Sequence, residues 1–203
     1  MEPTLAVERL QKRYGDHTAL ERADLIVRGG EAWALLGDNG AGKSTLLACL
    51  TGLRIPTSGN VRIDGLPARR PLARARLGVL PEKCALPGHH RLRTLLDPTR
   101  PVDAELARTL RLPDLLDRRL GTLSAGQHQR AALALALAGT PKWLVLDEPL
   151  TALDARTAEA VVAYVGGRIA AGTGALVATH RPAAWEPVVT HRCTIAAGVL
   201  AVP

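Results

Sequence analysis

The stretch GDNGAGKST constrains the fold of this chain more than any other segment. It matches the pattern G-x-x-x-x-G-K-[ST], follows the apolar run AWALL and opens a helix-forming segment over 43–50. Glycines let the backbone turn so that successive N–H groups converge on phosphate oxygens, and the helix start adds partial positive charge. The sequence therefore predicts a phosphate-binding loop formed by Gly37, Asp38, Asn39, Gly40, Ala41, Gly42, Lys43, Ser44 and Thr45.

Within this loop two side chains carry the expected chemistry. Lys43 has the length to reach the terminal phosphates of a nucleotide, and the Ser44 hydroxyl is a ligand type that Mg²⁺ accepts. Carboxylates suited to the same ion end the apolar stretch WLVLDEP. Asp147 is expected to enter the Mg²⁺ shell, and Glu148 to orient and deprotonate an attacking water.

Buried apolar runs alternate with helix-forming segments in the second half of the chain. A helical pattern over about 125–138 precedes the run KWLVLD, and another over 155–171 lies between KWLVLD and GALVAT. Gly166 and Gly167 weaken the second helix. This alternation predicts an α/β fold with a mainly parallel sheet covered on both faces. Short alternating strands over 4–36 predict an antiparallel part, and the last twenty residues predict a strand pair.

His180 directly follows the run GALVAT. The ends of strands in an open α/β sheet gather around the ligand crevice, so we expect this imidazole to approach a γ-phosphate. A polar residue that only ends a strand is the alternative interpretation.

Composition limits the class of protein. The chain has 203 residues, which suits one α/β domain, and it contains no uncharged apolar run of about 18 residues or more. Cys49, Cys84 and Cys193 are few and widely spaced, as expected in a reducing cytosol. The net charge of +7 indicates either a nucleic acid or anionic lipid partner, or simply solvated arginine-rich faces.

The stretch LSAGQHQR raises a second question. It opens the helix over about 125–138 with a serine and a glycine, which is typical of an anion-binding helix start. The chain already has a phosphate loop about eighty residues earlier.

Taken in order, these segments resemble the ATP-binding subunit of ABC transporters, over nearly the whole chain. Residues 37–45 match the Walker A loop, LSAGQ resembles the signature motif, LVLDEP matches Walker B, TALD matches the D-loop and ATH matches the H-loop. The resemblance implies ATP with Mg²⁺, a RecA-like P-loop NTPase core, a small antiparallel β-subdomain and a short helical subdomain. It divides one ABC ATPase domain, 1–203, into a core with β-subdomain (about 1–82 and 140–203) and a helical subdomain (about 83–139).

The same resemblance answers the question of two phosphate sites. Family members form head-to-tail dimers, homodimers or heterodimers, in which the signature of one subunit completes the Walker A site of the other. Ser124, Ala125, Gly126 and Gln127 would then act in trans, with Asp154 of the D-loop nearby. Tyr14 stands where the family places an aromatic that stacks on adenine.

Two residues depart from the family pattern. Glu82 replaces the glutamine usual before the helical subdomain, and it can still face Mg²⁺; Ala125 replaces a signature glycine. A short segment between Glu82 and the signature, together with LSAGQ and LDEPLTALD, resembles compact efflux ATPases, including the haem-exporter subunit of cytochrome c maturation.

Three classes of function follow. The favoured one is ATP hydrolysis that powers a membrane transporter. We expect an exporter, in which this chain is a cytoplasmic subunit bound to integral permease subunits at the inner face of the cell membrane. The alternatives are a soluble ABC ATPase that acts on ribosomes or nucleic acid, and a module that binds ATP without turnover. Single-cassette length argues against the first alternative, so no nucleic acid partner is expected, and the complete set Lys43, Asp147, Glu148 and His180 argues against the second.

Overall fold

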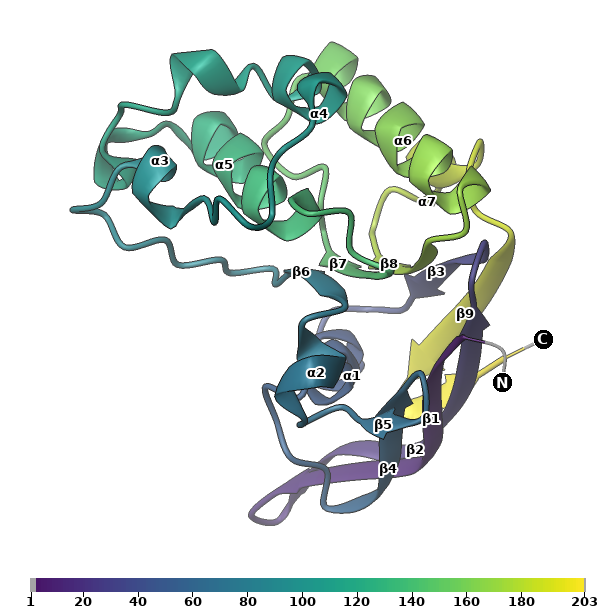
Figure 1. Ribbon diagram of the computed structural model, residues 1–203. Helices are drawn as coiled ribbons and strands as arrows, with labels where there is room; N and C mark the ends of the chain where they lie inside the picture. Colours follow the sequence, from purple (N-terminus) through teal and green to yellow (C-terminus); the bar gives the residue numbers. More distant parts are fainter. Residues whose placement is uncertain (1–2, 203) are drawn as a thin grey trace.

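The computed structural model describes residues 3–202, whose strands form one ten-stranded sheet in the order β5-β4-β1-β2-β10-β9-β3-β8-β7-β6 (Figure 1). The strands are β1 Thr4–Tyr14, β2 His17–Arg28, β3 Ala32–Leu36, β4 Ser58–Ile63, β5 Leu66–Pro67, β6 Leu77–Leu80, β7 Trp143–Asp147, β8 Gly174–Ala178, β9 His191–Ala196 and β10 Val199–Ala201. The helices are α1 Lys43–Leu50, α2 Pro71–Arg74, α3 Leu92–Leu95, α4 Ala104–Thr109, α5 Ala125–Leu137, α6 Ala155–Ala170 and α7 Pro182–Trp185, and the 3₁₀ turns are Leu112–Asp114 and Leu120–Thr122.

Five neighbouring strands, β9, β3, β8, β7 and β6, pair in parallel. Every residue of β7 and β8 is buried, as expected for central strands covered on both faces. The predicted α/β fold with a mainly parallel core is confirmed.

The antiparallel part differs from the prediction of short strands. β1 and β2 have 11 and 12 residues and pair almost along their full length. Pairing shifts register between Val7 and Leu10, where Arg9 has a φ of 47° and its N–H donates to the Asp24 carboxylate at 2.7 Å. This bulge interrupts the period-two alternation, so the sequence pattern ends before the strand does.

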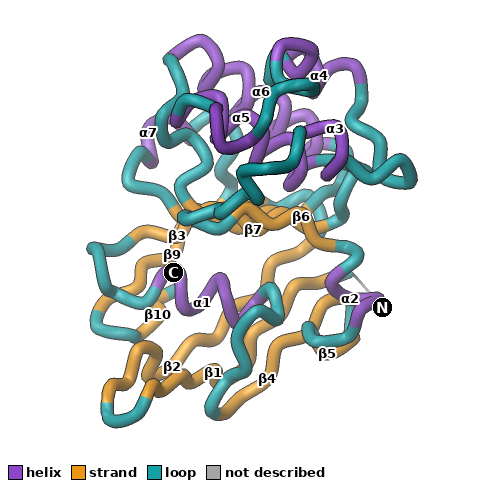
Figure 2. The backbone as a smooth tube through the Cα atoms, turned by 90° about the vertical axis from the view of Figure 1, so that its left-hand side faces the viewer, coloured by secondary structure: helices purple, strands orange, loops and turns teal. Residues whose placement is uncertain are grey.

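Helices cover the parallel strands on both faces (Figure 2). On one face lie α3 to α7, and on the other lies α1, enclosed between the parallel strands and the antiparallel strands β1, β2 and β4 (Figures 1 and 2). Two hydrophobic clusters correspond to these two spaces. One joins Leu80 and Leu146 to the helical layer, and the other joins Leu46 and Leu50 of α1 to both groups of strands.

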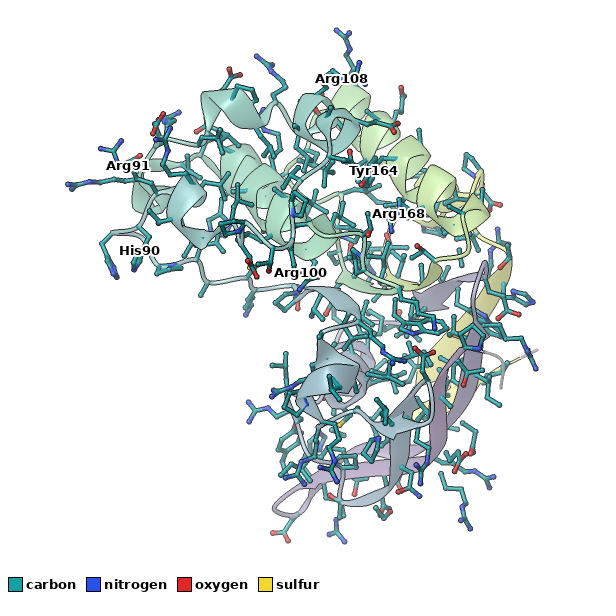
Figure 3. All side chains as sticks on the ribbon, in the orientation of Figure 1. His90, Arg91, Arg100, Arg108, Tyr164 and Arg168 are labelled. Atoms are coloured by element: carbon teal, nitrogen blue, oxygen red, sulfur yellow. The ribbon has the colours of Figure 1, made fainter. Side chains whose placement is uncertain are left out.

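The segment predicted as a helical subdomain, about 83–139, contains α3, α4, the two 3₁₀ turns and α5. Its apolar cluster is continuous with α6, and the buried Tyr164 of α6 donates a hydrogen bond to Asp103, the residue that caps α4, at 2.7 Å (Figure 3). Burial and this carboxylate raise the pKa of Tyr164 to about 12. α6 is continuous through Gly166, where the absence of a side chain leaves room for Val188.

The predicted C-terminal strand pair is β9 and β10. β10 lies between β2 and β9, and it pairs in parallel with β2 and antiparallel with β9. This hairpin therefore joins the antiparallel strands to the parallel ones.

Candidate functional site

The candidate site lies at the carboxyl ends of four parallel strands. The phosphate loop follows β3, Glu82 follows β6 after one proline, Asp147 ends β7, and His180 follows β8 after one threonine. Residues from four distant parts of the chain therefore meet at one edge of the sheet, as the sequence predicted.

The phosphate loop is shaped by close backbone contacts. Gly42 has a φ of 112°, and a Cβ at this position would lie 2.7 Å from the carbonyl oxygen of Ala19 in β2, so only glycine fits. Two further contacts come from the C-terminal hairpin: Gly198 N–H donates to Ala41 O at 3.1 Å, and Ile195 packs directly against Gly37. The loop is thus fixed from both sides.

The start of α1 offers unused hydrogen-bond donors. Among residues 3–202 no side chain caps the helix at Gly42, so the N–H groups of its first turn are left to a ligand or to solvent. The buried Lys43 ammonium donates to the carbonyl oxygens of Gly37 and Asp38 at 2.6 and 2.9 Å. This cation and these amides form a cradle suited to phosphate oxygens.

Ser44 and Asp147 form a partly buried polar pair, in which Ser44 is exposed and Asp147 is buried. The Ser44 hydroxyl donates to Asp147 Oδ2 at 2.8 Å, and the Asp147 side chain is almost fully buried. Burial raises the pKa of Asp147, and the Glu82 carboxylate raises it further, against the lowering effect of the hydrogen bond from Ser44. A cation would relieve this burial cost, and adjacent oxygen ligands of Mg²⁺ lie about 2.9 Å apart, so the pair fits that ion.

Glu148 lies next to Asp147 but points to a different partner. Its Oε1 lies 3.6 Å from His180 Nε2, and this oxygen is buried without a hydrogen-bond partner among the described residues. Burial raises the pKa of Glu148, Asp147 raises it further, and the neighbouring His180 lowers it. A carboxylate that lines the cleft and has a raised pKa is suited to accept a proton from a bound water.

One cleft of about 360 Å³ collects most of the predicted residues. It is lined by Tyr14, His17, Ala19, Asn39, Gly40, Gly42, Lys43, Ser44, Thr45, Glu82, Asp147, Glu148 and His180. Gly37, Asp38 and Ala41 belong to the same loop but do not line the cleft. His17 and Ala19 also line the cleft, although the sequence did not indicate them. They follow Tyr14 across the turn into β2.

Tyr14 stands at the mouth of this cleft and is partly exposed. The Lys12 ammonium lies 4.8 Å from the centroid of its ring, in a cation–π contact, and donates to Ile55 O at 2.8 Å. Lys12 thereby helps to hold the ring of Tyr14 in place at the edge of the cleft.

The signature residues Ser124, Ala125, Gly126 and Gln127 do not line this cleft. Ser124 caps α5: its hydroxyl accepts from Gln127 N–H at 3.3 Å, and Gln127 Oε1 accepts from Ser124 N–H and from Arg118, both at 3.0 Å. Asp154 likewise lies outside the cleft, where it caps α6 by accepting two hydrogen bonds from Thr157 at 2.9 Å. Both helix starts are exposed to solvent.

A second, apolar groove of about 290 Å³ adjoins the first at Glu82. Its walls include Leu47, Leu53 and Val79, and Leu53 is 61% exposed. In the arginine-rich segment over 69–76, Arg74 is exposed, whereas Arg76 is paired with Asp64. His90 and Arg91 project from the outer tip of the helical layer (Figure 3). No helix among residues 3–202 is long and apolar enough to cross a membrane.

Comparisons with known proteins agree with this geometry. A family model described as ABC transporter matches residues 20–151. The Nod factor export ATP-binding protein I of Cupriavidus metallidurans is 35% identical and aligns over 98% of this chain and 70% of its own length. The aliphatic sulfonates import ATP-binding protein SsuB 1 of Nocardia farcinica is 39% identical over 92% of this chain and 71% of its own length.

A solved structure has the same fold. The "Dimeric Structure of MJ0796, a Bacterial ABC Transporter Cassette" matches with a TM-score of 0.83, over 97% of this chain and 96% of the other, at 23% sequence identity.

Proposed function

This chain belongs to the ABC transporter family as an ATP-binding cassette, and from that premise we propose that its ATPase activity powers export through separate integral membrane permease subunits. The observation that carries the proposal is the meeting of Lys43, the Ser44–Asp147 pair and Glu148 in one cleft. These groups are the ones that phosphoryl transfer from ATP to water requires.

ATP would enter the cleft with its phosphates on the loop and its base toward Tyr14. The N–H groups at the start of α1 and the Lys43 ammonium bind phosphate oxygens, and the ring of Tyr14, braced by Lys12, stacks on adenine. Ser44 and Asp147 would hold Mg²⁺, and Glu82 lines the same cleft. When bound, the ion neutralises charge on the phosphate oxygens.

Hydrolysis would use the adjacent Glu148 and His180. The Glu148 carboxylate, which lines the cleft, takes a proton from a water as the water oxygen bonds to the γ-phosphorus. The bond from the γ-phosphorus to the β–γ bridging oxygen breaks, and ADP and phosphate leave. His180 is half exposed beside that carboxylate, where its imidazole donates to the γ-phosphate.

The signature acts in a second copy, in a homodimer or a heterodimer of ATPase subunits. Its serine and helix start are exposed and absent from the cleft of their own chain, which leaves them available to the nucleotide of a partner. The solved neighbour described as dimeric gives independent support for pairing in this fold.

The apolar groove beside Glu82 is the proposed contact for the permease, at the cytoplasmic face of the cell membrane. The exposed Leu53 belongs to its wall, and the groove shares Glu82 with the nucleotide cleft, so a partner bound there would sense the nucleotide. We expect exposed arginines such as Arg74 to face acidic permease loops or lipid head groups. Arg76 is a poor choice for testing this, because its substitution also breaks the ion pair with Asp64.

Export is the finer part of the proposal. One relative is named for export and the other for import, so support for export comes from Glu82 and from the short segment before the signature. The resemblance of LSAGQ and LDEPLTALD to haem-exporter subunits makes haem the first substrate to test.

Two measurements test the proposal. Proteins that copurify from membranes in mild detergent are identified by mass, and we expect an integral permease; ribosomal proteins instead would favour the alternative of a soluble ABC ATPase. ATP turnover is measured beside this, and Glu148→Gln is expected to retain ATP binding while turnover falls roughly 10²- to 10⁴-fold. Unchanged turnover would exclude Glu148 as the base.

A further inference from the structure

Gln129 joins the signature helix to the backbone of Glu148. It lies one turn into α5, and its side-chain amide donates to Pro149 O at 2.9 Å and approaches Glu148 O at 3.4 Å. Gln129 does not line the nucleotide cleft, and the sequence reasoning gave it no role.

The segment that Gln129 contacts has an unusual backbone. Glu148 has a φ of 48° and Ala152 a φ of 60°, both in the left-handed region that residues with a side chain rarely adopt. Such conformations persist only when surrounding contacts hold them. At Glu148 the N–H donates to Ala178 O of β8 at 2.9 Å, and the carbonyl accepts from Thr151 N–H at 3.2 Å.

Gln129 supplies the support on the side that faces the helical layer. Without its amide, the carbonyl of Pro149 would lose a partly buried hydrogen bond on the side of the turn that faces α5. The direction of the Glu148 side chain depends on the φ of that residue, so loosening the turn moves the carboxylate.

A second contact ties the start of the same helix to the same turn. A Cβ added at Gly126 would lie 2.7 Å from the carbonyl oxygen of Ala152. The start of α5 thus packs against Ala152, one of the two residues with positive φ. Gln129 holds Pro149, which directly follows Glu148, the other residue with positive φ. The two contacts come from one rigid helix, so a displacement of its N-terminus is transmitted to both.

We propose that Gln129 is a positioning residue that holds Glu148 in its catalytic orientation and couples it to the signature motif. The inference rests on the proposed function, in which Glu148 is the base and the signature binds the partner's ATP. When the signature of one subunit binds the partner's ATP, Gln129 of that subunit would align Glu148 of the same subunit. This Glu148 acts on the ATP bound in the cleft of its own chain. The two sites of a dimer are linked through this side chain.

The test compares three variants of the full chain, together with its membrane partner where turnover requires it. Gln129→Met keeps the length of the side chain and removes the amide donor, and Gln129→Lys keeps an N–H donor. Gln11→Met makes the same exchange on β1, outside the cleft. If Gln129→Met does not fold, Gln129→Glu, of equal size and without the donor, replaces it.

We expect Gln129→Met to lower kcat about tenfold or more, with little change in KM or in the ATP affinity of the monomer. The Hill coefficient for ATP should fall toward one, and hydrogen exchange at the Thr151 amide should accelerate. Gln129→Lys should recover most of the turnover, and Gln11→Met should behave as wild type.

The inference is overturned if kcat of Gln129→Met stays within twofold of wild type, if ATP affinity falls in parallel with kcat, or if Gln129→Lys is no better than Gln129→Met. A wild-type chain that binds ATP without turning it over would instead overturn the proposed function. The two failures are therefore distinguishable.

Discussion

The Ser44 hydroxyl donates to the Asp147 carboxylate at 2.8 Å, although 103 residues separate the two in the chain. The pair joins the first turn of α1 to the end of β7. It therefore connects the helix that follows the phosphate-loop sequence with the strand that ends directly before Glu148.

Ser44→Ala should weaken binding of ATP only when Mg²⁺ is present. The variant loses one proposed ligand of the ion but leaves the loop amides and Lys43 in place. Titrations with a fluorescent ATP analogue, with Mg²⁺ and with EDTA, measure this. Equal affinity losses in both buffers would mean that Ser44 supports the loop and not the metal.

Lys43→Ala should weaken nucleotide binding itself, in either buffer. A charge-assisted hydrogen bond to phosphate contributes about 1.5–3 kcal/mol, so the Kd should rise roughly 10- to 100-fold. Calorimetry measures the affinity, and Lys142→Ala serves as a control because Lys142 pairs with Asp64 outside the cleft. Similar affinities for the two variants would refute the role of Lys43.

Stability should depend on pH through Glu148. Its pKa is raised by burial, so the folded state holds the proton more firmly than the unfolded state does. The free energy of unfolding should then fall as pH rises from about 4.3, the ordinary pKa of glutamate, through the raised value. Glu148→Gln removes this dependence and should be more stable than wild type at pH 8, with the difference shrinking toward pH 4.5.

Urea denaturation at several pH values measures this difference. Identical pH profiles for the two proteins would contradict the raised pKa. The same shift predicts that the acidic limb of kcat/KM for ATP hydrolysis lies above the ordinary glutamate range.

Ser124→Arg should leave ATP binding to the monomer nearly intact and abolish ATP-driven dimerisation and turnover. The bulky side chain obstructs the exposed helix start that the partner's nucleotide would contact. Since Ser124 also caps α5, Ser124→Ala is the matched control; it loses the cap, worth about 1 kcal/mol, without adding bulk. Sedimentation with ATP measures the dimer, and loss of monomer binding would show that the signature acts within its own chain.

Much of the site could be predicted because its chemistry needs fixed residue types next to fixed elements. The phosphate loop is local, since its glycines and Lys43 stand within nine residues. Asp147, Glu82 and His180 are distant in sequence, but each follows an apolar strand. The rule that parallel strands end at one edge was enough to bring Asp147 and His180 together, whereas the family resemblance placed Glu82 beside them.

What escaped prediction depends on contacts between elements. Gln129 stands among ordinary helix residues, and only packing reveals that its amide reaches Pro149. The full length of β1 was hidden by the bulge at Arg9, and the insertion of β10 between β2 and β9 leaves no trace in local periodicity. Such non-local pairings depend on the fold as a whole.

The position of the C-terminal hairpin has a consequence for the order of synthesis. Ile195 and Gly198 press against Gly37 and Ala41, so the phosphate loop is supported from one side by residues translated more than 150 positions later. A nascent chain that ends before β9 has every phosphate-binding residue but lacks the wall that shapes the loop. Competence to bind ATP should therefore arise only after β9 and β10 have been synthesised and have folded against the loop.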